Sequence, residues 1–273
     1  MITIISAEKN QVVTPTKFPD GTSQVWKLEL AGMHIAKIVW DFEQEAELIW
    51  VNQLIALLQA EKIVISELFM PYLPYARQDK PISNNATFAK EVFLGMLNTQ
   101  NIAKISTLDA HSFHQQIESY SAINFIEKAL QQFMPTIVVF PDKGAFERYQ
   151  YCFNSNAYLI LTLDKVRNQA TGEITALTIE ASRTSPELLI RQPEKLHQLL
   201  IIDDICDGGA TFNNAALYLH QHYNCTIGLY VTHGIFSKGF DKMMASGISQ
   251  FFTTQSLKKN TDGFAIDALI TGE

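Results

Sequence analysis

Residues 199–211 read LLIIDDICDGGAT, and this segment decides how the rest of the sequence is interpreted. Its apolar start predicts a buried strand, because a strand covered on both faces is apolar almost throughout. Two aspartates, Asp203 and Asp204, follow that strand, and a glycine-bearing loop then leads into an amphipathic stretch at residues 212–222. We therefore expect a strand, a short loop and a helix, with Thr211 as the helix N-cap.

This segment has the features of a phosphate-binding loop. The amides of residues 207–211 would point into one concavity at a helix N-terminus, where N–H donors and the helix dipole favour an anion. Asp203 and Asp204 would lie beside the anion and accept hydrogen bonds from two ribose hydroxyls, or hold a metal. The alternative is an ordinary strand-turn-helix with solvated acids. Adjacent acids at the end of a buried strand are costly without a ligand, which favours the binding site.

Apolar runs alternate with amphipathic stretches along the chain, which predicts βαβ units and mostly parallel sheets. The expected strands are residues 2–6, 35–39, 62–68, 102–107, 136–140, 158–162, 175–179, 198–202, 226–232 and 264–270, with a hairpin tip at 169–173. The expected helices are residues 45–60, 88–100, 122–132, 144–153 and 212–222. A new strand opens after residues 132–135, so we divide the chain into domains of residues 1–133 and 134–273.

Composition excludes several classes of protein. The chain has 273 residues and a formal net charge of -7, and phosphate-backbone binding needs a basic face, so we expect no nucleic-acid partner. Three cysteines without a CxxC pair predict neither a disulfide framework nor structural zinc. No run approaches 18 apolar residues, and the apolar start lacks a basic region before it. We expect no membrane span, no signal peptide and a cytoplasmic location.

Six further segments stand out, in chain order: FPDG at 18–21, MPYLPYARQDK at 70–80, DAH at 109–111, VVFPDKG at 138–144, LDKVR at 163–167 and THGIFS at 232–237. Together with residues 199–211, they resemble the ribose-phosphate pyrophosphokinase family, also called phosphoribosyl-pyrophosphate synthetases. Residues 199–211 alone also resemble the sugar-phosphate loop of type I phosphoribosyltransferases. One such match can arise by chance, whereas six in the family's order are specific.

The resemblance implies an α/β fold of two type I phosphoribosyltransferase-like domains, with mostly parallel sheets flanked by helices. Residues 1–133 would form the ATP side and residues 134–273 the sugar-phosphate side, with the active site between them. The implied reaction transfers the β,γ-diphosphate of ATP to the C1 hydroxyl of ribose 5-phosphate, giving phosphoribosyl pyrophosphate and AMP. Such a transfer depends on positioning and charge neutralisation rather than on a covalent intermediate.

The resemblance also assigns the residues that neutralise charge. Lys165 and Arg167 match a catalytic pair on a loop that closes over the triphosphate. His111 and Asp142 match residues that hold Mg²⁺ on the ATP phosphates, and His111 also counts among the ATP contacts. His114 is an alternative to His111, because the family segment needs a one-residue insertion here. Without the resemblance, each of these groups would be read as a solvated or structural residue.

The remaining implied contacts concern the two substrates. Arg77 and Gln78 would bind ATP, while Phe18 and Asp20 would hold adenine from a neighbouring subunit, which implies a homo-oligomer with shared active sites. His233 would line the sugar site or satisfy a buried loop. The sugar phosphate would lie on Asp203, Asp204, Asp207, Gly208, Gly209, Ala210 and Thr211.

Several positions depart from the family pattern. Gly208 stands where a threonine is usual, Ala210 replaces a glycine, and Thr22 replaces an acid. The first strand is followed so soon by FPDG that the usual helix between them is expected to be missing. Loss of the side chain at Gly208 removes a donor and would open space. The acceptor could therefore be a larger 5-substituted ribose, such as ADP-ribose, in the same reaction.

Two other functions remain as alternatives. A phosphoribosyltransferase would share residues 199–211, but it would not need the ATP-side segment MPYLPYARQDK. A non-catalytic regulatory homologue would not need to keep Lys165, Arg167 and the paired aspartates. Release of AMP from ATP distinguishes the synthetase from both.

Overall fold

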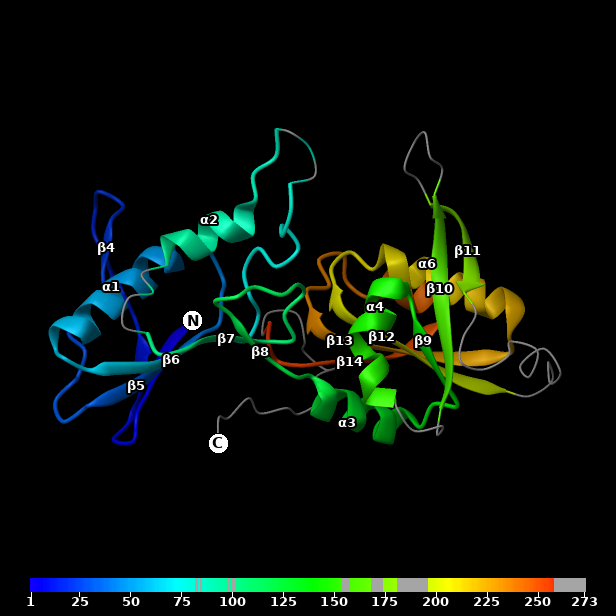
Figure 1. Ribbon diagram of the computed structural model, residues 1–273, viewed down its shortest axis with the longest axis horizontal. Coiled ribbons are helices and arrows are strands. Elements are labelled where there is room, and N and C mark those ends of the chain that lie inside the picture. The colour runs from blue at the N-terminus through cyan, green and yellow to red at the C-terminus, as the bar shows by residue number, and fades with distance from the viewer. Residues whose placement is uncertain are drawn as a thin grey trace. The chain divides into compact units, whose positions relative to one another are not determined.

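The computed structural model describes residues 1–81, 83, 85–97, 99, 102–153, 158–167, 174–180 and 196–257, with backbone alone for 165–167 and 174–180. The chain divides into two compact units, Met1–Ser121 and Ala122–Glu273 (Figure 1). Each unit contains a six-stranded sheet, and both sheets are mostly parallel, with helices in most of the connections between parallel strands. The predicted strand at 264–270 and the predicted hairpin tip at 169–173 lie outside the described residues.

The sheet of the first unit has the strand order β2-β1-β5-β6-β7-β8. Its strands are β1 (Ile2–Ile5), β2 (Asn10–Val13), β5 (Ile35–Trp40), β6 (Val64–Met70), β7 (Ile105–Leu108) and β8 (Glu118–Tyr120). Strand β1 runs antiparallel to β2 and β5, whereas β5 to β8 are parallel neighbours. A separate two-stranded sheet pairs β3 (Thr16–Lys17) with β4 (Ser23–Gln24).

The helices of the first unit are α1 (Glu47–Ala60) and α2 (Ala89–Met96). Helix α1 buries Val51, Leu54, Ile55 and Leu58, at the three- and four-residue spacing that places side chains on one helical face. That face packs towards β6, which contacts α1. The apolar positions of β5 alternate with less buried ones, as in a strand with one face on a core.

The sheet of the second unit has the order β11-β10-β9-β12-β13-β14, and only β10 and β11 are antiparallel. Its strands are β9 (Ile137–Phe140), β10 (Leu159–Arg167), β11 (Ile174–Glu180), β12 (His197–Cys206), β13 (Cys225–Gly234) and β14 (Ile248–Thr253). Among the described residues of this unit, the helices are α3 (Ile123–Phe133), α4 (Lys143–Tyr149), which a 3₁₀ turn η1 (Gln150–Phe153) continues, α6 (Ala210–His222) and α7 (Asp241–Ala245).

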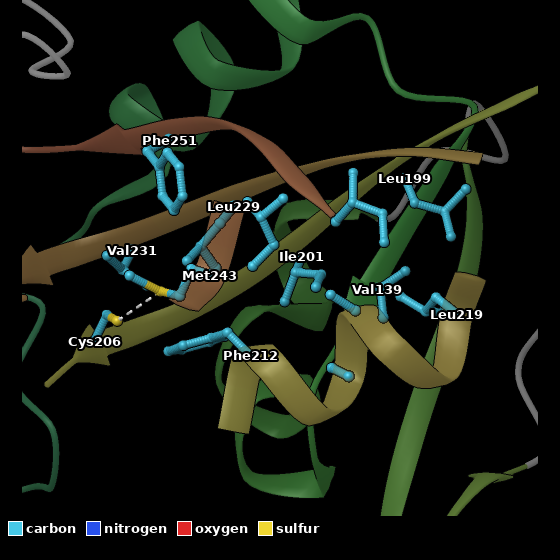
Figure 2. Close-up of a cluster of buried hydrophobic side chains, with 14 of the residues drawn as sticks. Val139, Leu199, Ile201, Cys206, Phe212, Leu219, Leu229, Val231, Met243 and Phe251 are labelled. Carbon is cyan, nitrogen blue, oxygen red and sulfur yellow. Dashed lines mark hydrogen bonds between the residues drawn. The ribbon is translucent and has the colours of Figure 1, made fainter. Parts of the chain in front are cut away.

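Two apolar clusters cover the two faces of this sheet. One contains Ile201 of β12 with Leu219 of α6 and Met243 of α7 (Figure 2). The other contains Ile202 of β12 with Ile126 of α3, among other residues. Because neighbouring residues of a strand point to opposite faces, the adjacent pair in β12 reaches both clusters. The prediction of a strand covered on both faces is confirmed.

The boundary between the two units differs from the one predicted at residues 133 and 134. Helix α3 belongs to the second unit, which begins at Ala122. Its apolar face, including Ile126 and Phe133, packs in the same cluster as Val138 and Leu200 of the second sheet. The packing of α3, rather than the start of the next strand, therefore sets the division. In the described part of the chain, no helix combines the length and apolar character needed to cross a membrane.

Candidate active site

Strand β12 is longer than predicted and includes both aspartates. It runs from His197 to Cys206, and Asp203 pairs with Val231 in the parallel strand β13. Asp203 and Asp204 therefore occupy the carboxyl end of a central strand instead of a loop after it. Asp204 is buried and Asp203 is half-buried. The prediction that these acids lie where ligands bind in parallel sheets fits this placement.

The charges at this end of β12 are close enough to affect one another. The amide of Asp204 donates to Asp203 Oδ1 at 2.8 Å, and Arg148 Nη2 of α4 lies 3.5 Å from Asp204 Oδ2. Burial raises the pKa of Asp203 well above its ordinary value, and the negative charges of Asp204 and Asp142 raise it further. A hydroxyl donor or a cation would relieve this repulsion.

The loop after β12 begins helix α6 earlier than predicted. Gly209, not Thr211, is the N-cap, and Thr211 is the second residue of the helix. Gly209 has a φ of 77°, which a glycine adopts without steric cost. A Cβ at this position would also lie 2.8 Å from Met243 Sδ. Backbone conformation and the packing of Met243 therefore both require glycine here, and the helix N-terminus lies directly beside the loop.

A second loop, after β13, fixes the first. The carbonyl of Cys206 accepts hydrogen bonds from the amides of Ile235 and Phe236, at 2.8 and 3.1 Å. The hydroxyl of Ser237 donates to Asp207 Oδ1 at 2.6 Å. The segment 232–237 that stood out in the sequence thus supports the loop at 206–211.

The space beside Gly208 is not open. A Cβ at this position would lie 3.2 Å from Lys238 Cδ and 3.3 Å from Lys238 Cε. The methylene stem of Lys238 thus occupies the place that a side chain at residue 208 would take. The expectation that Gly208 opens a larger pocket is wrong in this respect, because the second loop fills the space.

His233 lies near the carboxyl end of strand β13 and is buried. It is 2% exposed, and its Nδ1 lies 2.8 Å from Ser256 Oγ. The carbonyl of the preceding Thr232 accepts from the hydroxyls of Thr254 and Ser256, at 2.7 and 3.2 Å. Of the two interpretations of His233, these contacts favour the one in which it holds a buried loop.

Asp142 lies at the same sheet edge as the aspartates of β12. It follows β9, which is a parallel neighbour of β12, and its charge is among those that raise the pKa of Asp203. It is also the N-cap of α4, where its Oδ1 accepts from the amide of Ala145 at 3.0 Å. A role in helix capping and a role in binding a cation can coexist, because a carboxylate has two oxygens.

Lys165 and Arg167 lie within a strand rather than on a loop. Strand β10 extends to Arg167, and the backbone of Lys165 pairs with Leu177 in the antiparallel strand β11. Hairpin pairing continues the strand beyond the apolar run that the sequence showed. The side chains of residues 165–167 are outside the described part of the structure.

The residues expected to hold adenine form a turn between β3 and β4. The amide of Phe18 donates to the carbonyl of Thr22 at 2.9 Å, and Phe18 is 38% exposed. Asp20 accepts hydrogen bonds from the Thr22 hydroxyl at 2.7 Å and from the Thr22 amide at 3.0 Å. These bonds, that of the hydroxyl first, lower the pKa of Asp20. Thr22, which departs from the family pattern, therefore orients the acid next to it.

The expected ATP contacts Arg77 and Gln78 are exposed on the loop after β6. Lys90, at the start of α2, connects this loop to the one that carries His111. Its amide donates to the carbonyl of Gln78 at 3.2 Å, and its ammonium donates to Ser112 Oγ at 2.6 Å. Lys90 is only 2% exposed. The structure therefore brings together, within the first unit, two segments that the sequence could only place separately.

His111 and His114, the two candidates for the expected metal ligand, have different neighbours. His114 Nε2 lies 3.2 Å from a carboxylate oxygen of Glu91 on α2. His111 lies half-buried in the bend that follows β7, next to Ser112. No group of three or more potential metal ligands occurs among the described residues. His111 belongs to the first unit and Asp142 to the second.

Sequence inspection missed three basic residues that contact the expected site. They are Lys90, Arg148 and Lys238. Lys90 and Arg148 lie on helices and Lys238 on a loop, and each looks like an ordinary surface cation in the sequence. The structure reveals them, because Lys90 contacts the loop that contains Gln78, Arg148 contacts Asp204, and Lys238 lies beside Gly208.

Comparison with known proteins identifies similar sequences and a similar fold. No family model matches the chain. The chain is 25% identical over 202 residues to a ribose-phosphate pyrophosphokinase from Mesorhizobium japonicum, covering 69% of this chain and 60% of the relative. It is 25% identical over 227 residues to ribose-phosphate pyrophosphokinase 4 of Saccharomyces cerevisiae, covering 78% and 66%. The chain thus spans less than two thirds of the length of these curated relatives.

Two further similarities extend over most of the chain. A ribose-phosphate pyrophosphokinase from Sulfolobus acidocaldarius is 21% identical over 262 residues, covering 91% of this chain and 86% of the relative. The crystal structure of phosphoribosylpyrophosphate synthetase from Mycobacterium smegmatis has a TM-score of 0.73 at 18% identity, covering 93% and 85%. The latter establishes the α/β fold of the two units. The shared fold and the matches to several curated proteins together support a divergent member of the ribose-phosphate pyrophosphokinase family.

Proposed function

We propose that this protein transfers the β,γ-diphosphate of ATP to the C1 hydroxyl of ribose 5-phosphate, giving phosphoribosyl pyrophosphate and AMP. The observation that carries the proposal is the carboxyl end of β12, where Asp203 and Asp204 adjoin a loop and the start of α6. Crowded carboxylates beside a helix N-terminus suit a ligand that bears both hydroxyls and a phosphate.

Each group at this end of β12 has a role in the proposal. Two ribose hydroxyls donate hydrogen bonds to Asp203 and Asp204, and Arg148 supports the charge of Asp204 from 3.5 Å. The loop amides of residues 207–211 bind the phosphate on the sugar. The C1 oxygen then attacks the β-phosphorus of ATP, a new oxygen–phosphorus bond forms, and the bond to the α-phosphate oxygen breaks to release AMP. The proton of the C1 hydroxyl leaves to the surroundings.

The proposal assigns ATP to the first unit. Arg77 and Gln78 are exposed, and Lys90 fixes their loop against the one with His111. Burial, followed by the charges of Asp204 and Asp142, raises the pKa of Asp203, and carboxylate oxygens such as those of Asp142 fit Mg²⁺. His111 and Asp142 are the proposed protein ligands. Bound Mg²⁺ would neutralise the phosphate charge and orient the triphosphate.

Three further assignments complete the proposal. Lys165 and Arg167 supply positive charge to the diphosphate as it transfers, because charge builds up there in the transition state. Phe18 and Asp20 of a second copy hold adenine, which makes the active protein a homo-oligomer. Their turn supports this assignment, since Phe18 is partly exposed and Asp20 is held in place by Thr22.

The test is the release of AMP from ATP and Mg²⁺, with ribose 5-phosphate and ADP-ribose as separate acceptors. We expect AMP with ribose 5-phosphate, and a loss of about 100-fold in kcat for the double variant Lys165→Ala, Arg167→Ala. The exposed helical Lys242 provides a control, because Lys242→Ala should leave the rate unchanged. Release of AMP chiefly with ADP-ribose would mean that the protein catalyses the same reaction on a larger acceptor.

Two outcomes would overturn the proposal. A wild-type protein that binds ATP but releases no AMP with either acceptor would be a regulatory homologue. A protein that instead consumes phosphoribosyl pyrophosphate in the presence of a nucleobase would be a phosphoribosyltransferase.

A further inference from the structure

The loop at residues 206–211 lacks a donor that its proposed ligand needs. Gly208 has no side chain, so it offers no hydroxyl to a phosphate on the sugar. Asp203, Asp204 and Asp207 bring negative charge to the same short segment. A phosphate carries nearly two negative charges near neutral pH, and like charges a few ångströms apart repel. A cation beside this loop would therefore be required for tight binding.

Lys238 places such a cation at the loop. Within residues 203–211 and 232–239, which form the two loops and the strand ends before them, Lys238 is the one lysine or arginine. Its side chain runs beside Gly208, with Cδ 3.2 Å and Cε 3.3 Å from the position of a Cβ there. The nearby Arg148 is directed to Asp204. Lys238 itself is exposed, which leaves its ammonium accessible to a ligand.

The two loops are joined so that the backbone of Lys238 is held beside Gly208. The hydrogen bonds from Ile235 and Phe236 to the Cys206 carbonyl set the backbone of the second loop against the first. The hydroxyl of Ser237, directly before Lys238, donates to Asp207 Oδ1 at 2.6 Å. The backbone that carries Lys238 is therefore anchored within one residue of Gly208 and within one residue of Lys238.

We propose that Lys238 is the specificity-determining residue of the sugar site, and that its ammonium binds the 5-phosphate in place of the missing side chain at Gly208. This inference rests on the proposed function. Gly208 and Lys238 form a matched pair, because a side chain at 208 would lie 3.2 Å from the lysine stem and would make the stem move. The favoured acceptor is a ribose with a terminal phosphate monoester, whose doubly charged end attracts an ammonium more strongly than a diphosphate diester does at each phosphate.

The first experiment measures steady-state kinetics and calorimetric binding of ribose 5-phosphate to Lys238→Ala. We expect the KM and the Kd to rise about tenfold while kcat stays within about twofold, since a contact present in both ground and transition states changes KM alone. Lys242→Ala, which removes another exposed lysine of the same unit, should change neither constant. Unphosphorylated ribose should lose little affinity in Lys238→Ala, because it offers the ammonium no phosphate.

A second variant tests the pairing itself. In Gly208→Thr the new side chain displaces the lysine stem, and we expect the KM for ribose 5-phosphate to change by less than tenfold because a hydroxyl replaces the ammonium. In the double variant Gly208→Thr, Lys238→Gly the KM should be lower than in Lys238→Ala. A double variant that is as weak as Lys238→Ala would contradict the exchange of one donor for the other.

The outcomes separate this inference from the proposed function. Wild-type protein that forms AMP, with a Kd for ribose 5-phosphate unaltered by Lys238→Ala, overturns the inference and leaves the function standing. Wild-type protein that forms no AMP overturns the function. In that case calorimetry still decides the inference, which holds if Lys238→Ala weakens ribose 5-phosphate binding and fails if wild type and variant bind equally or not at all. A loss of affinity for ADP-ribose alone also overturns it.

Discussion

Strands β6 and β12 both lie inside mostly parallel sheets, but the surroundings of their side chains differ on the two faces of the sheet. In β12, Ile201 and Ile202 are both fully buried and belong to separate apolar clusters on the two faces. In β6, Leu68 is fully buried, but its neighbour Glu67 belongs to a charged network. Figure 1 shows α1 and α2 on the same side of the first sheet, whereas the helices of the second unit flank both clusters.

The difference concerns how each unit holds its expected binding loops. In the second unit, apolar packing on both faces fixes the end of β12, so the loop to α6 starts from a rigid support. In the first unit, charged and hydroxyl groups on one face satisfy one another. Glu67 accepts from the Tyr120 hydroxyl at 2.6 Å and from the Ser106 hydroxyl, and Lys37 Nζ lies 3.0 Å away. The stability of the second unit should therefore depend on the volume of buried side chains at β12. The stability of the first unit should depend on the charge of Glu67 and its partners.

The largest effect should follow from truncating the central strand of the second unit. Ile201→Ala and Ile202→Ala should each lower the free energy of unfolding by about 3 kcal/mol, because each leaves a cavity in a full cluster. All three tryptophans, Trp26, Trp40 and Trp50, lie in the first unit. Urea unfolding followed by far-UV circular dichroism should shift, while unfolding followed by tryptophan fluorescence should shift less.

Half-exposed Leu217 of α6 supplies the control. Leu217→Ala should cost less than about 1 kcal/mol, since most of its surface is already in water. Equal costs at Ile201 and Ile202 would support two covered faces. If Ile202→Ala lowered the free energy of unfolding as little as Leu217→Ala, the face of the sheet that packs against α3 and α4 would not be a closely packed core.

The next effect concerns the charged face of the first unit. Burial alone would raise the pKa of Glu67, but hydrogen bonds from Ser106, Tyr120 and Lys37 outweigh it and lower the pKa from 4.5 to about 2. Lys104 Nζ also lies 3.5 Å from Glu67 Oε1. Glu67→Gln should lower the free energy of unfolding at neutral pH by about 2 kcal/mol, because it leaves two ammonium groups without their buried carboxylate.

The effect of Glu67→Gln on the free energy of unfolding should depend on pH. A carboxylate with a lowered pKa stabilises the fold fully above its unfolded pKa, and that stability is lost as the pH falls through the folded pKa. The difference between wild type and Glu67→Gln should therefore be largest above pH 4.5 and shrink as the pH approaches 2. Tryptophan fluorescence during urea unfolding at several pH values measures it. A difference that stays constant across this range would show that charge is not responsible.

The sequence was sufficient for the long periodic elements and for the order of the expected site segments. The predicted helix at 45–60 and the strand at 198–202 correspond to α1 and β12, because burial imposes a regular spacing over many residues. It was not sufficient for β8, α7 and β14, which went unpredicted. The three-residue β8 and the five-residue α7 are too short to show a period, and in β14 the polar Ser249 and Gln250 interrupt the apolar residues.

Contacts between loops were also beyond the sequence. Thr211 has the chemistry of an N-cap, yet Gly209 takes that position because its positive φ and the neighbouring Met243 determine the turn. Lys238 and Gly208 are far apart in the chain, and nothing in their local sequence shows that one side chain fills the space left by the other. Tertiary packing decides such cases, so residue type and spacing cannot.

The two glycines of the sugar-phosphate loop should differ in their tolerance of a side chain. Gly209→Ala should lower the free energy of unfolding by about 2 kcal/mol, because alanine is strained at a φ of 77° and its Cβ would meet Met243 Sδ at 2.8 Å. Gly208→Ala should cost less than about 0.5 kcal/mol, since the Lys238 stem that it meets is flexible. Far-UV circular dichroism during urea unfolding compares them. Equal costs would contradict the separate roles of these glycines.

The smallest effect tests whether Asp142 has one role or two. Among the described helices, α4 is the one whose N-cap side chain accepts a hydrogen bond, from the Ala145 amide to Asp142 Oδ1. Asp142→Ala should therefore lower the free energy of unfolding by about 1 kcal/mol, whereas Asp142→Asn should leave it nearly unchanged, because asparagine caps a helix as well as aspartate does.

The same pair of variants separates capping from cation binding. If Asp142 is a ligand of Mg²⁺, both variants lose the negative oxygen that Mg²⁺ prefers, and the Mg²⁺ concentration for half-maximal AMP release should rise at least about tenfold in each. If Asp142 is only a cap, Asp142→Asn should titrate with Mg²⁺ like wild type while Asp142→Ala alone is destabilised. Asp142→Asn therefore decides between the two roles. Because its free energy of unfolding should match that of wild type, a higher Mg²⁺ requirement in this variant could not be caused by loss of structure.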